Sequence, residues 1–197
     1  MHDGPDEVIF APSGRSVATA NPQGVYVFDT ATGRTILERK AELIKAAFIN
    51  PAFPPSGELL ATSHADGTIR LWDYPSGELR TSFRAHDKTC HRLVFSRDGQ
   101  TLAVSSLDHT ISLWNPRTLE RQAVLRGHGD RPESLVISPD DRTLISGCYQ
   151  GVIKTWDLAT GRERQTLARS GYPISRMTVT ADGRTLATTG GRETEAR

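Results

Sequence analysis

Cysteines and long apolar runs are scarce in this sequence of 197 residues, and each scarcity excludes a class of protein. The two cysteines, Cys90 and Cys148, are too few for a disulfide framework and stand at unrelated positions, so we expect a reducing, cytoplasmic setting. No apolar run approaches the roughly 20 residues that cross a bilayer, and the polar residues 1–7 do not resemble a signal peptide. The sequence therefore predicts neither a disulfide scaffold nor a membrane-spanning protein.

An excess of one charge is also missing. Lysine and arginine number 24 and aspartate and glutamate 23, and the two signs are intermixed, which gives a formal net charge of +1. Proteins that bind nucleic acid or anionic membranes by electrostatics carry a basic patch or stripe. We therefore expect no nucleic-acid partner and no membrane partner.

The sequence carries no convincing motif for a cofactor or a metal. The segment 190–192, Gly-Gly-Arg, lacks the strand, the helix and the lysine of a phosphate-binding loop. His86, Cys90 and His91 have metal-binding side chains, but Cys90 and His91 are neighbours on a predicted strand and point to opposite faces. Because no second cluster completes a set of four ligands, we expect no metal and no cofactor.

The few tryptophans of the chain are evenly placed. Trp72, Trp114 and Trp156 are separated by one interval of 42 residues. Aliphatic residues recur at the same interval, in the series Leu60, Leu102, Leu144 and Leu186 and in the series Ile69, Ile111 and Ile153. A period of this length is typical of four-stranded propeller blades, so the chain is predicted to be a repeat array.

Within each period, short apolar runs alternate with tight-turn signals. Asp66-Gly67 and Asp98-Gly99 are examples of such turns, and Asp141 and Leu119 stand where other copies have glycine. Apolar and polar residues alternate with a period of two in the runs, which strands require, and no stretch sustains a helical period. The sequence predicts an all-β fold made of four-stranded antiparallel units.

These motifs resemble the WD-repeat β-propeller family. Arg-Ala-His86 and Arg-Gly-His128 resemble its Gly-His motif, Trp72-Asp73 and Trp156-Asp157 resemble its closing Trp-Asp, and Trp114-Asn115 is a near match. Phe28-Asp29 closes an earlier, divergent copy. The resemblance covers nearly the whole chain and implies one propeller domain.

The repeats are predicted at fixed boundaries. The first, divergent repeat spans 1–40, and the others span 41–83, 84–125, 126–167 and, as a partial fifth, 168–192, with a polar tail at 193–197. A fourth tryptophan would fall at position 198, and the apolar pattern stops before it. We therefore expect an incomplete or open arc, either a fragment of a longer propeller or an arc completed by a partner, with a compact five-blade ring as the weaker alternative. An open strand edge would favour self-association.

A set of serine, histidine, aspartate and tryptophan recurs with the repeats and permits two interpretations. In the third repeat His86, Ser106 and Asp108 have the composition of a hydrolase triad, with Ser105 as the alternative serine. The family resemblance instead implies a buried hydrogen-bond network within each blade, which we favour. Its expected members are His86, Ser106, Asp108 and Trp114, then Thr62, Asp66 and Trp72, and finally His128, Ser146 and Trp156, with Gln150 in place of an aspartate.

The resemblance also implies where partners bind. The expected face is formed by the loops that lead into first strands and by the turns between second and third strands. Its candidate partner-binding residues are Asp87, Lys88, Thr89, Leu107, Asp130, Arg131 and Tyr149. The expected function is a non-catalytic scaffold for protein or peptide partners. The alternatives are a repeat segment of a larger multidomain regulatory or signalling protein and, as the weakest, a propeller hydrolase.

Overall fold

The computed structural model describes residues 7–40 and 48–191, and these contain strands and turns but no helix. The predicted polar tail at 193–197 and parts of the first, second and fifth predicted repeats lie outside the described residues. Two four-stranded antiparallel sheets come first in the chain. Their strands are β1 (Glu7–Phe10), β2 (Ser16–Asn21), β3 (Gly24–Asp29) and β4 (Thr35–Lys40), then β5 (Phe48–Ala52), β6 (Leu59–His64), β7 (Thr68–Asp73) and β8 (Leu79–Arg84).

Two more four-stranded sheets and one two-stranded sheet follow, again with consecutive strands paired antiparallel. Their strands are β9 (Cys90–Phe95), β10 (Leu102–Ser106), β11 (Ile111–Trp114) and β12 (Arg121–Leu125), then β13 (Pro132–Ile137), β14 (Thr143–Cys148), β15 (Val152–Asp157) and β16 (Glu163–Arg169), and lastly β17 (Arg176–Val179) and β18 (Leu186–Thr189). The predicted all-β fold of four-stranded units is confirmed. We call the sheets blades one to five.

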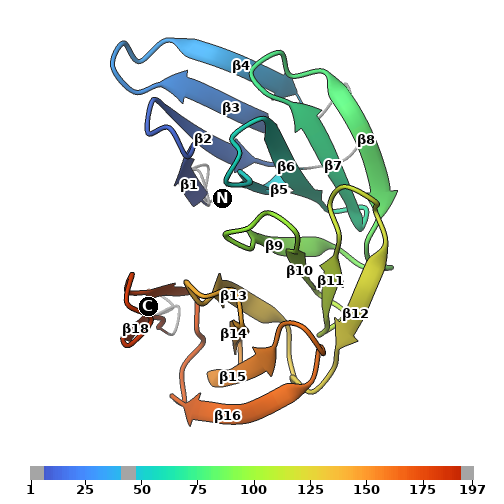
Figure 1. Ribbon diagram of the computed structural model, residues 1–197, viewed down its shortest axis with the longest axis vertical. Helices are drawn as coiled ribbons and strands as arrows, with labels where there is room; N and C mark the ends of the chain where they lie inside the picture. Colours follow the sequence, from blue (N-terminus) through green and yellow to red (C-terminus); the bar gives the residue numbers. More distant parts are fainter. Residues whose placement is uncertain (1–6, 41–47, 192–197) are drawn as a thin grey trace, which may run out of the picture.

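The blades are arranged around a common centre in chain order (Figure 1). The first strand of each blade lies nearest the centre, and β4, β8, β12 and β16 form the outer rim. The ring is not closed, because blade one and the β17–β18 pair lie at the two ends of the arc and face each other across its opening. The open arc expected from the sequence is therefore the arrangement observed.

The tight turns explain both the glycines and their replacements. Gly57, Gly99 and Gly183 have φ values near +70°, and Asp141, which stands at the same place in blade four, has φ +56°. A side chain at such an angle is strained by roughly 1–2 kcal/mol. The Asp141 carboxylate offsets this strain, because it accepts hydrogen bonds from the backbone N–H groups of Arg97 (2.7 Å) and Asp98 (2.9 Å) in blade three. Asp141, which departs from the glycine pattern of the repeat, thus links blade four to blade three.

The core lies between successive blades, where each tryptophan meets the outer strand of the preceding blade. Phe83 of β8 packs against Trp114, with ring centroids 4.7 Å apart. Leu125 of β12 belongs to the same buried cluster as Trp156. Leu167 of β16 holds the next position in this series, and it is 47% exposed at the open end of the arc.

Three prolines among residues 51–55 do not make blade two irregular in length. The strand β5 instead runs through Pro51, which pairs with Thr62, and has a register shift between Phe48 and Pro51. Blade three has a register shift at the equivalent place between β9 and β10. Blade two is therefore as long as blade three.

Candidate functional site

The meander of each blade places its connections at two opposite ends. The loops 85–89, 126–131 and 170–175, which we call the leading loops, meet the turns 65–67, 107–110 and 149–151 between second and third strands. Backbone hydrogen bonds join them, from Leu107 N to Thr89 O (3.0 Å) and from Tyr149 N to Arg131 O (3.1 Å). We call this end of the arc the loop face. The turns between first and second strands and between third and fourth strands form the opposite end, which we call the turn face.

Beneath the loop face, blade three contains a continuous chain of buried hydrogen bonds. Trp114 Nε1 donates to Ser112 Oγ (2.7 Å), and Ser112 Oγ lies 2.7 Å from His86 Nε2. His86 Nδ1 lies 2.9 Å from the Asp108 carboxylate, which only accepts, so we assign the proton to Nδ1. The chain links the leading loop to β11 and to the turn that carries Asp108.

The serine of this network is Ser112 and not Ser106 or Ser105. Ser106 Oγ accepts a hydrogen bond from Asp108 N (3.2 Å), and Ser105 Oγ accepts one from Arg92 N (3.0 Å). The 42-residue spacing contains the signal that would have excluded Ser106, because Thr62 and Ser146 align with Val104. Val104 has no hydroxyl, and Ser112 on the neighbouring strand supplies one.

In blade two the network uses a histidine that the sequence analysis missed. Trp72 Nε1 donates to Thr62 Oγ1 (2.8 Å), and Thr62 Oγ1 lies 2.8 Å from Nε2 of the fully buried His64. Asp66 takes no part in this chain. It accepts hydrogen bonds from Thr68 and from Arg70 at 3.1 Å instead. Burial would raise the pKa of the Asp66 carboxyl, but these partners hold it below its usual value.

Blade four has a hydroxyl and a tryptophan indole at the same positions as blade two, but it lacks the carboxylate that contacts the histidine in blade three. Trp156 Nε1 donates to Ser146 Oγ (2.8 Å), which lies 2.6 Å from His128 Nε2. Because Gln150 stands where blade three has Asp108, His128 Nδ1 is buried with no hydrogen-bond partner among the described residues. Burial, together with the nearby charge of Lys154, lowers the pKa of His128 to about 4. The ring is therefore neutral at physiological pH.

The blade-three chain has the connectivity of a Ser-His-Asp triad but not its accessibility. Ser112 is fully buried, and its oxygen already accepts the Trp114 N–H, so a substrate carbonyl has no path to it. Cys90 is also fully buried, and burial raises the pKa of its thiol to about 12. The described residues contain no cluster of three or more metal-binding side chains. The arrangement ties the strands of blade three together and leaves both Ser112 and Cys90 closed to solvent.

The exposed chemistry of the loop face centres on Arg131 and Tyr149. The Arg131 guanidinium lies over the Tyr149 ring, 4.2 Å from its centroid, and forms an ion pair with Glu133. The hydrogen bond that Arg131 donates to the Glu133 carboxylate raises the pKa of Arg131 above its usual value. Tyr149 is nevertheless 44% exposed. An aromatic ring and a guanidinium are thus held in place before any partner arrives.

The other candidate residues have different surroundings. Asp87 and Lys88 are exposed, and Asp87 contacts Arg84 at 3.4 Å. Thr89 ties the loop down, because its Oγ1 donates to Ala65 O (3.1 Å). Leu107 is half-buried, and the half-buried Asp130 accepts the backbone N–H of Arg131 at 2.7 Å. Of these residues, Asp87, Lys88 and Leu107 contribute surface, whereas Thr89 and Asp130 fix the conformation of their loops.

Tyr172 is a surface aromatic that the sequence analysis missed. It is 55% exposed in the leading loop 170–175. That loop lies against the turn that carries Tyr149, since Ser170 N donates to Gly151 O (2.9 Å) and Ile174 N to Cys148 O (3.2 Å). Its place one period after Asp130 was the available signal. Arg131, Tyr149 and Tyr172 together form what we call the aromatic patch.

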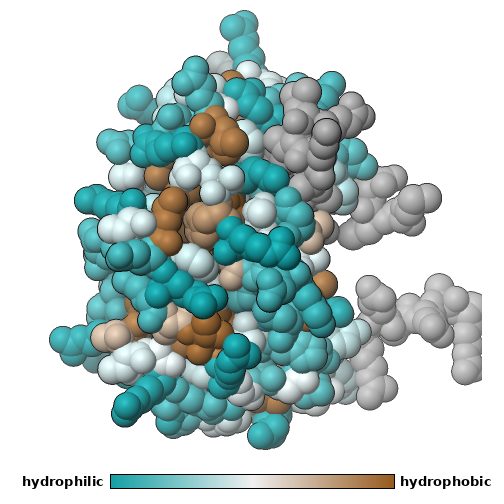
Figure 2. All heavy atoms as spheres, turned by 90° about the vertical axis from the view of Figure 1, so that its right-hand side faces the viewer, coloured by the Kyte–Doolittle hydropathy of each residue, from teal (hydrophilic) through white to brown (hydrophobic). Residues whose placement is uncertain are grey.

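The outer rim differs from this patch. Figure 2 views the rim, where hydrophilic side chains predominate and hydrophobic ones form small, separate groups. Residues of β8 and β16 explain the view, because most of their side chains are exposed and polar. No helix in the described residues is long and apolar enough to cross a membrane.

Comparisons with known proteins agree with this geometry. The family model described as WD domain, G-beta repeat matches residues 49–73, 77–115 and 119–157, more than half of the chain. WD repeat-containing protein 91 of Gallus gallus is 34% identical over 86 residues, which are 44% of this chain and 12% of that protein. Its homolog in Dictyostelium discoideum is 30% identical over 99 residues, which are 47% of this chain and 13% of that protein. The chain thus matches only a small part of these relatives, and its three matched repeats, with their tryptophans on the third strand of each blade, show that it belongs to the WD-repeat family.

Proposed function

We propose that this chain is a non-catalytic scaffold that binds protein or peptide partners through its loop face. The carrying observation is the aromatic patch, in which Tyr149 and Tyr172 are about half exposed and Arg131 is held over the Tyr149 ring. Tyrosine and arginine are enriched among the residues that dominate protein interfaces. The Glu133 ion pair already restrains Arg131, which lowers the entropy lost on binding.

The chemistry of the patch favours a protein over a polyanion. Glu133 neutralises Arg131, so the patch has little net charge to attract nucleic acid or an anionic membrane. A peptide that presents an apolar or aromatic side chain can stack on the two tyrosines. Carbonyl groups of the same peptide can accept hydrogen bonds from the guanidinium.

The test is a quantitative affinity purification with wild-type protein and with the double variant Tyr149→Ser and Tyr172→Ser. Both side chains are outside the buried clusters, so the variant should keep its thermal unfolding temperature. We expect recovered partners to fall with this variant and to persist with a control variant on the turn face, Arg34→Ala, which changes an exposed side chain in the turn between β3 and β4. Partners whose recovery is insensitive to the tyrosines would contradict the proposal.

A second candidate function is that of a repeat segment within a larger multidomain regulatory or signalling protein. It is supported by the relatives, of which the matched segments are only 12% and 13%. Sequencing of the full transcript decides the matter. Further Trp-Asp repeats or an enzyme domain in the same frame would support this function, and a reading frame without either would refute it.

Two further parts of the proposal concern the setting and assembly of the chain. A reducing, cytoplasmic setting is supported by Cys90 and Cys148, which are both free and buried thiols. Self-association is supported by β18, whose outer edge pairs with no described strand. Light scattering over a range of concentrations should detect a dimer that Thr188→Lys weakens, and a monomer at all concentrations would contradict it. Fractionation of cells tests the compartment.

A further inference from the structure

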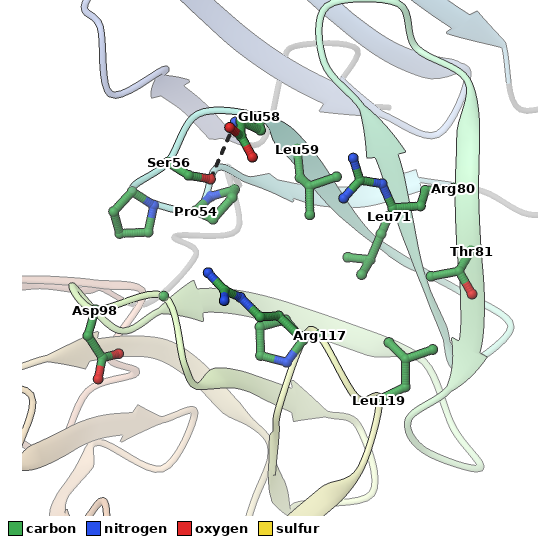
Figure 3. A pocket seen from close by; sticks show the side chains of 13 residues that line it. Pro54, Ser56, Glu58, Leu59, Leu71, Arg80, Thr81, Asp98, Arg117 and Leu119 are labelled. Carbon is green, nitrogen blue, oxygen red and sulfur yellow. Dashed lines mark hydrogen bonds between the residues drawn. The ribbon is translucent and has the colours of Figure 1, made fainter.

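The turn face contains a cavity between blades two and three that lies away from the aromatic patch. It has a volume of about 540 Å³, within the range of ligand pockets. Leu59, Leu71 and Leu119 line its apolar side, and Pro54, Arg80 and Arg117 line its rim. Figure 3 shows Arg117 extending from blade three toward the turn that carries Pro54 and Ser56.

The cavity is formed where the repeat departs from its own pattern. Leu119 occupies a position with φ +60° that glycine holds in blades one, two and four. Pro54 stands where blades three to five have the hydroxyl residues Ser96, Ser138 and Thr180, and Arg117 stands where blade four has Ala159. These departures lie on two different turns, and the fold brings them to one place.

The corresponding space between blades one and two is bridged by the chain itself. The one between blades three and four is reduced to about 110 Å³, and one of about 530 Å³ remains between blade four and the two-stranded blade five. Between blades one and two, Arg39 donates to Gly77 O (2.9 Å) and Ser76 O (3.2 Å), and Leu37 leaves no room for a Cβ on Gly77. Between blades three and four, the Asp141 carboxylate binds the turn at Arg97. The described residues place no such bridge across the cavity of blades two and three.

The charges around the cavity define what fits there. Arg80 is paired with Asp73, so its charge is already neutralised. Arg117 is exposed and forms no ion pair with a described residue, and it is therefore available to a carboxylate. Glu58 and Asp98 lie on the rim and disfavour a ligand with several negative charges. The leucines require an apolar group beside the single acid.

We propose that this cavity binds a short extended peptide that carries one large aliphatic side chain and one acidic residue close to it. The aliphatic side chain lies against Leu59 and Leu119, and the carboxylate pairs with Arg117. Ser56 and Thr81 supply hydroxyl groups to the peptide backbone. This site is independent of the proposed loop-face function, because it lies at the opposite end of the blades.

The test is selection of a phage-displayed library of random octapeptides on the wild-type chain, followed by binding of labelled synthetic peptides. We expect selected peptides to share a leucine, isoleucine or methionine with an aspartate or glutamate within two positions. The double variant Arg117→Ala and Leu119→Gly gives the turn of blade three the residues that blade four has at these positions. It should weaken binding about tenfold or more, because a charge-assisted pair and an apolar wall are lost together.

Controls separate this site from loss of folding and from the loop face. Arg117→Glu changes only an exposed side chain, so it should weaken binding without altering thermal unfolding. Replacing the acidic residue of a selected peptide by lysine should weaken its binding to the wild-type chain but not its binding to the Arg117→Ala variant. Tyr149→Ser should leave binding unchanged. Selected peptides that lack the aliphatic–acidic pair, that bind the double variant as well as wild type, or that require Tyr149 would overturn the proposal.

Discussion

Gln150→Asp should complete the hydrogen-bond network of blade four. In blade three, Asp108 accepts from His86 Nδ1 at 2.9 Å and from Thr110 N at 2.9 Å. In blade four, His128 Nδ1 is buried without a partner among the described residues, and glutamine replaces the aspartate. An aspartate at position 150 lies one period after Asp108 and should reach the histidine in the same way.

The magnitude follows from the blade-three geometry. A hydrogen bond to a charged group stabilises by roughly 1.5–3 kcal/mol. Partial desolvation of the new carboxylate offsets some of this gain, although the Asp108 side chain remains 27% exposed at the equivalent site. We expect Gln150→Asp to raise the free energy of unfolding by about 1–2 kcal/mol at neutral pH. The pKa of His128 should rise by roughly 1–3 units from its present value.

The pH dependence has a definite sign. The pKa of His128 is about 4 in the folded chain, below the ordinary 6.5, so the unfolded chain binds the proton more tightly. The contribution of His128 to the free energy of unfolding is therefore complete above pH 6.5. This contribution falls by about 3 kcal/mol as the pH drops through 4. Gln150→Asp should reduce this acid loss, because the new carboxylate stabilises the protonated ring.

The assay is urea unfolding at pH 7 and pH 5, with an NMR titration of the His128 ring proton. Gln150→Asn is the matched control, since it supplies a side chain of the same length without the charge. The reasoning is refuted if Gln150→Asp is no more stable than Gln150→Asn and the pKa of His128 stays near 4.

Four further substitutions test the contacts within and between blades by urea unfolding. Ser112→Ala should lower the free energy of unfolding by about 2–4 kcal/mol, because it leaves two buried ring N atoms without their partner, and Ser106→Ala should lower it by about 1 kcal/mol or less. The reverse order would show that Ser106 is the network serine. Asp141→Ala should lower the free energy by about 1–2 kcal/mol, since it keeps the strained φ and loses two hydrogen bonds, and no loss would remove the proposed link between blades. Leu125→Ala should lower it by about 2–4 kcal/mol through a cavity beside Trp156, and a loss below 1 kcal/mol would contradict that packing.

The repeat interval predicts the strands and turns because both depend on residues close together in the chain. The same interval places Asp141 and Leu119 at glycine positions, and the structure shows φ +56° and φ +60° there. It aligns Val104 with Thr62 and Ser146, which shows that β10 lacks a hydroxyl at this one position. That Ser112 replaces it depends on two neighbouring strands in space, which spacing alone does not report.

The surfaces were harder to predict than the blades. Arg131 and Tyr149 are separated by two strands in the sequence, and their contact depends on how the leading loop folds over the turn. The turn-face cavity depends on Pro54 and Leu119, which belong to turns of different blades. Both features arise from packing between segments. The sequence pattern identified Arg131 and Tyr149 but neither their contact nor the turn-face cavity.

Photo-crosslinking from single positions tests most directly whether partners bind the loop face. A photoreactive phenylalanine derivative replaces Tyr149 in one variant and the exposed Ala159, on the turn face, in a matched control. Both variants are irradiated in cells, and adducts are identified by mass spectrometry. The account predicts specific protein adducts at position 149 that are absent at position 159. Equal adducts at the two positions, or adducts at position 159 alone, would contradict it.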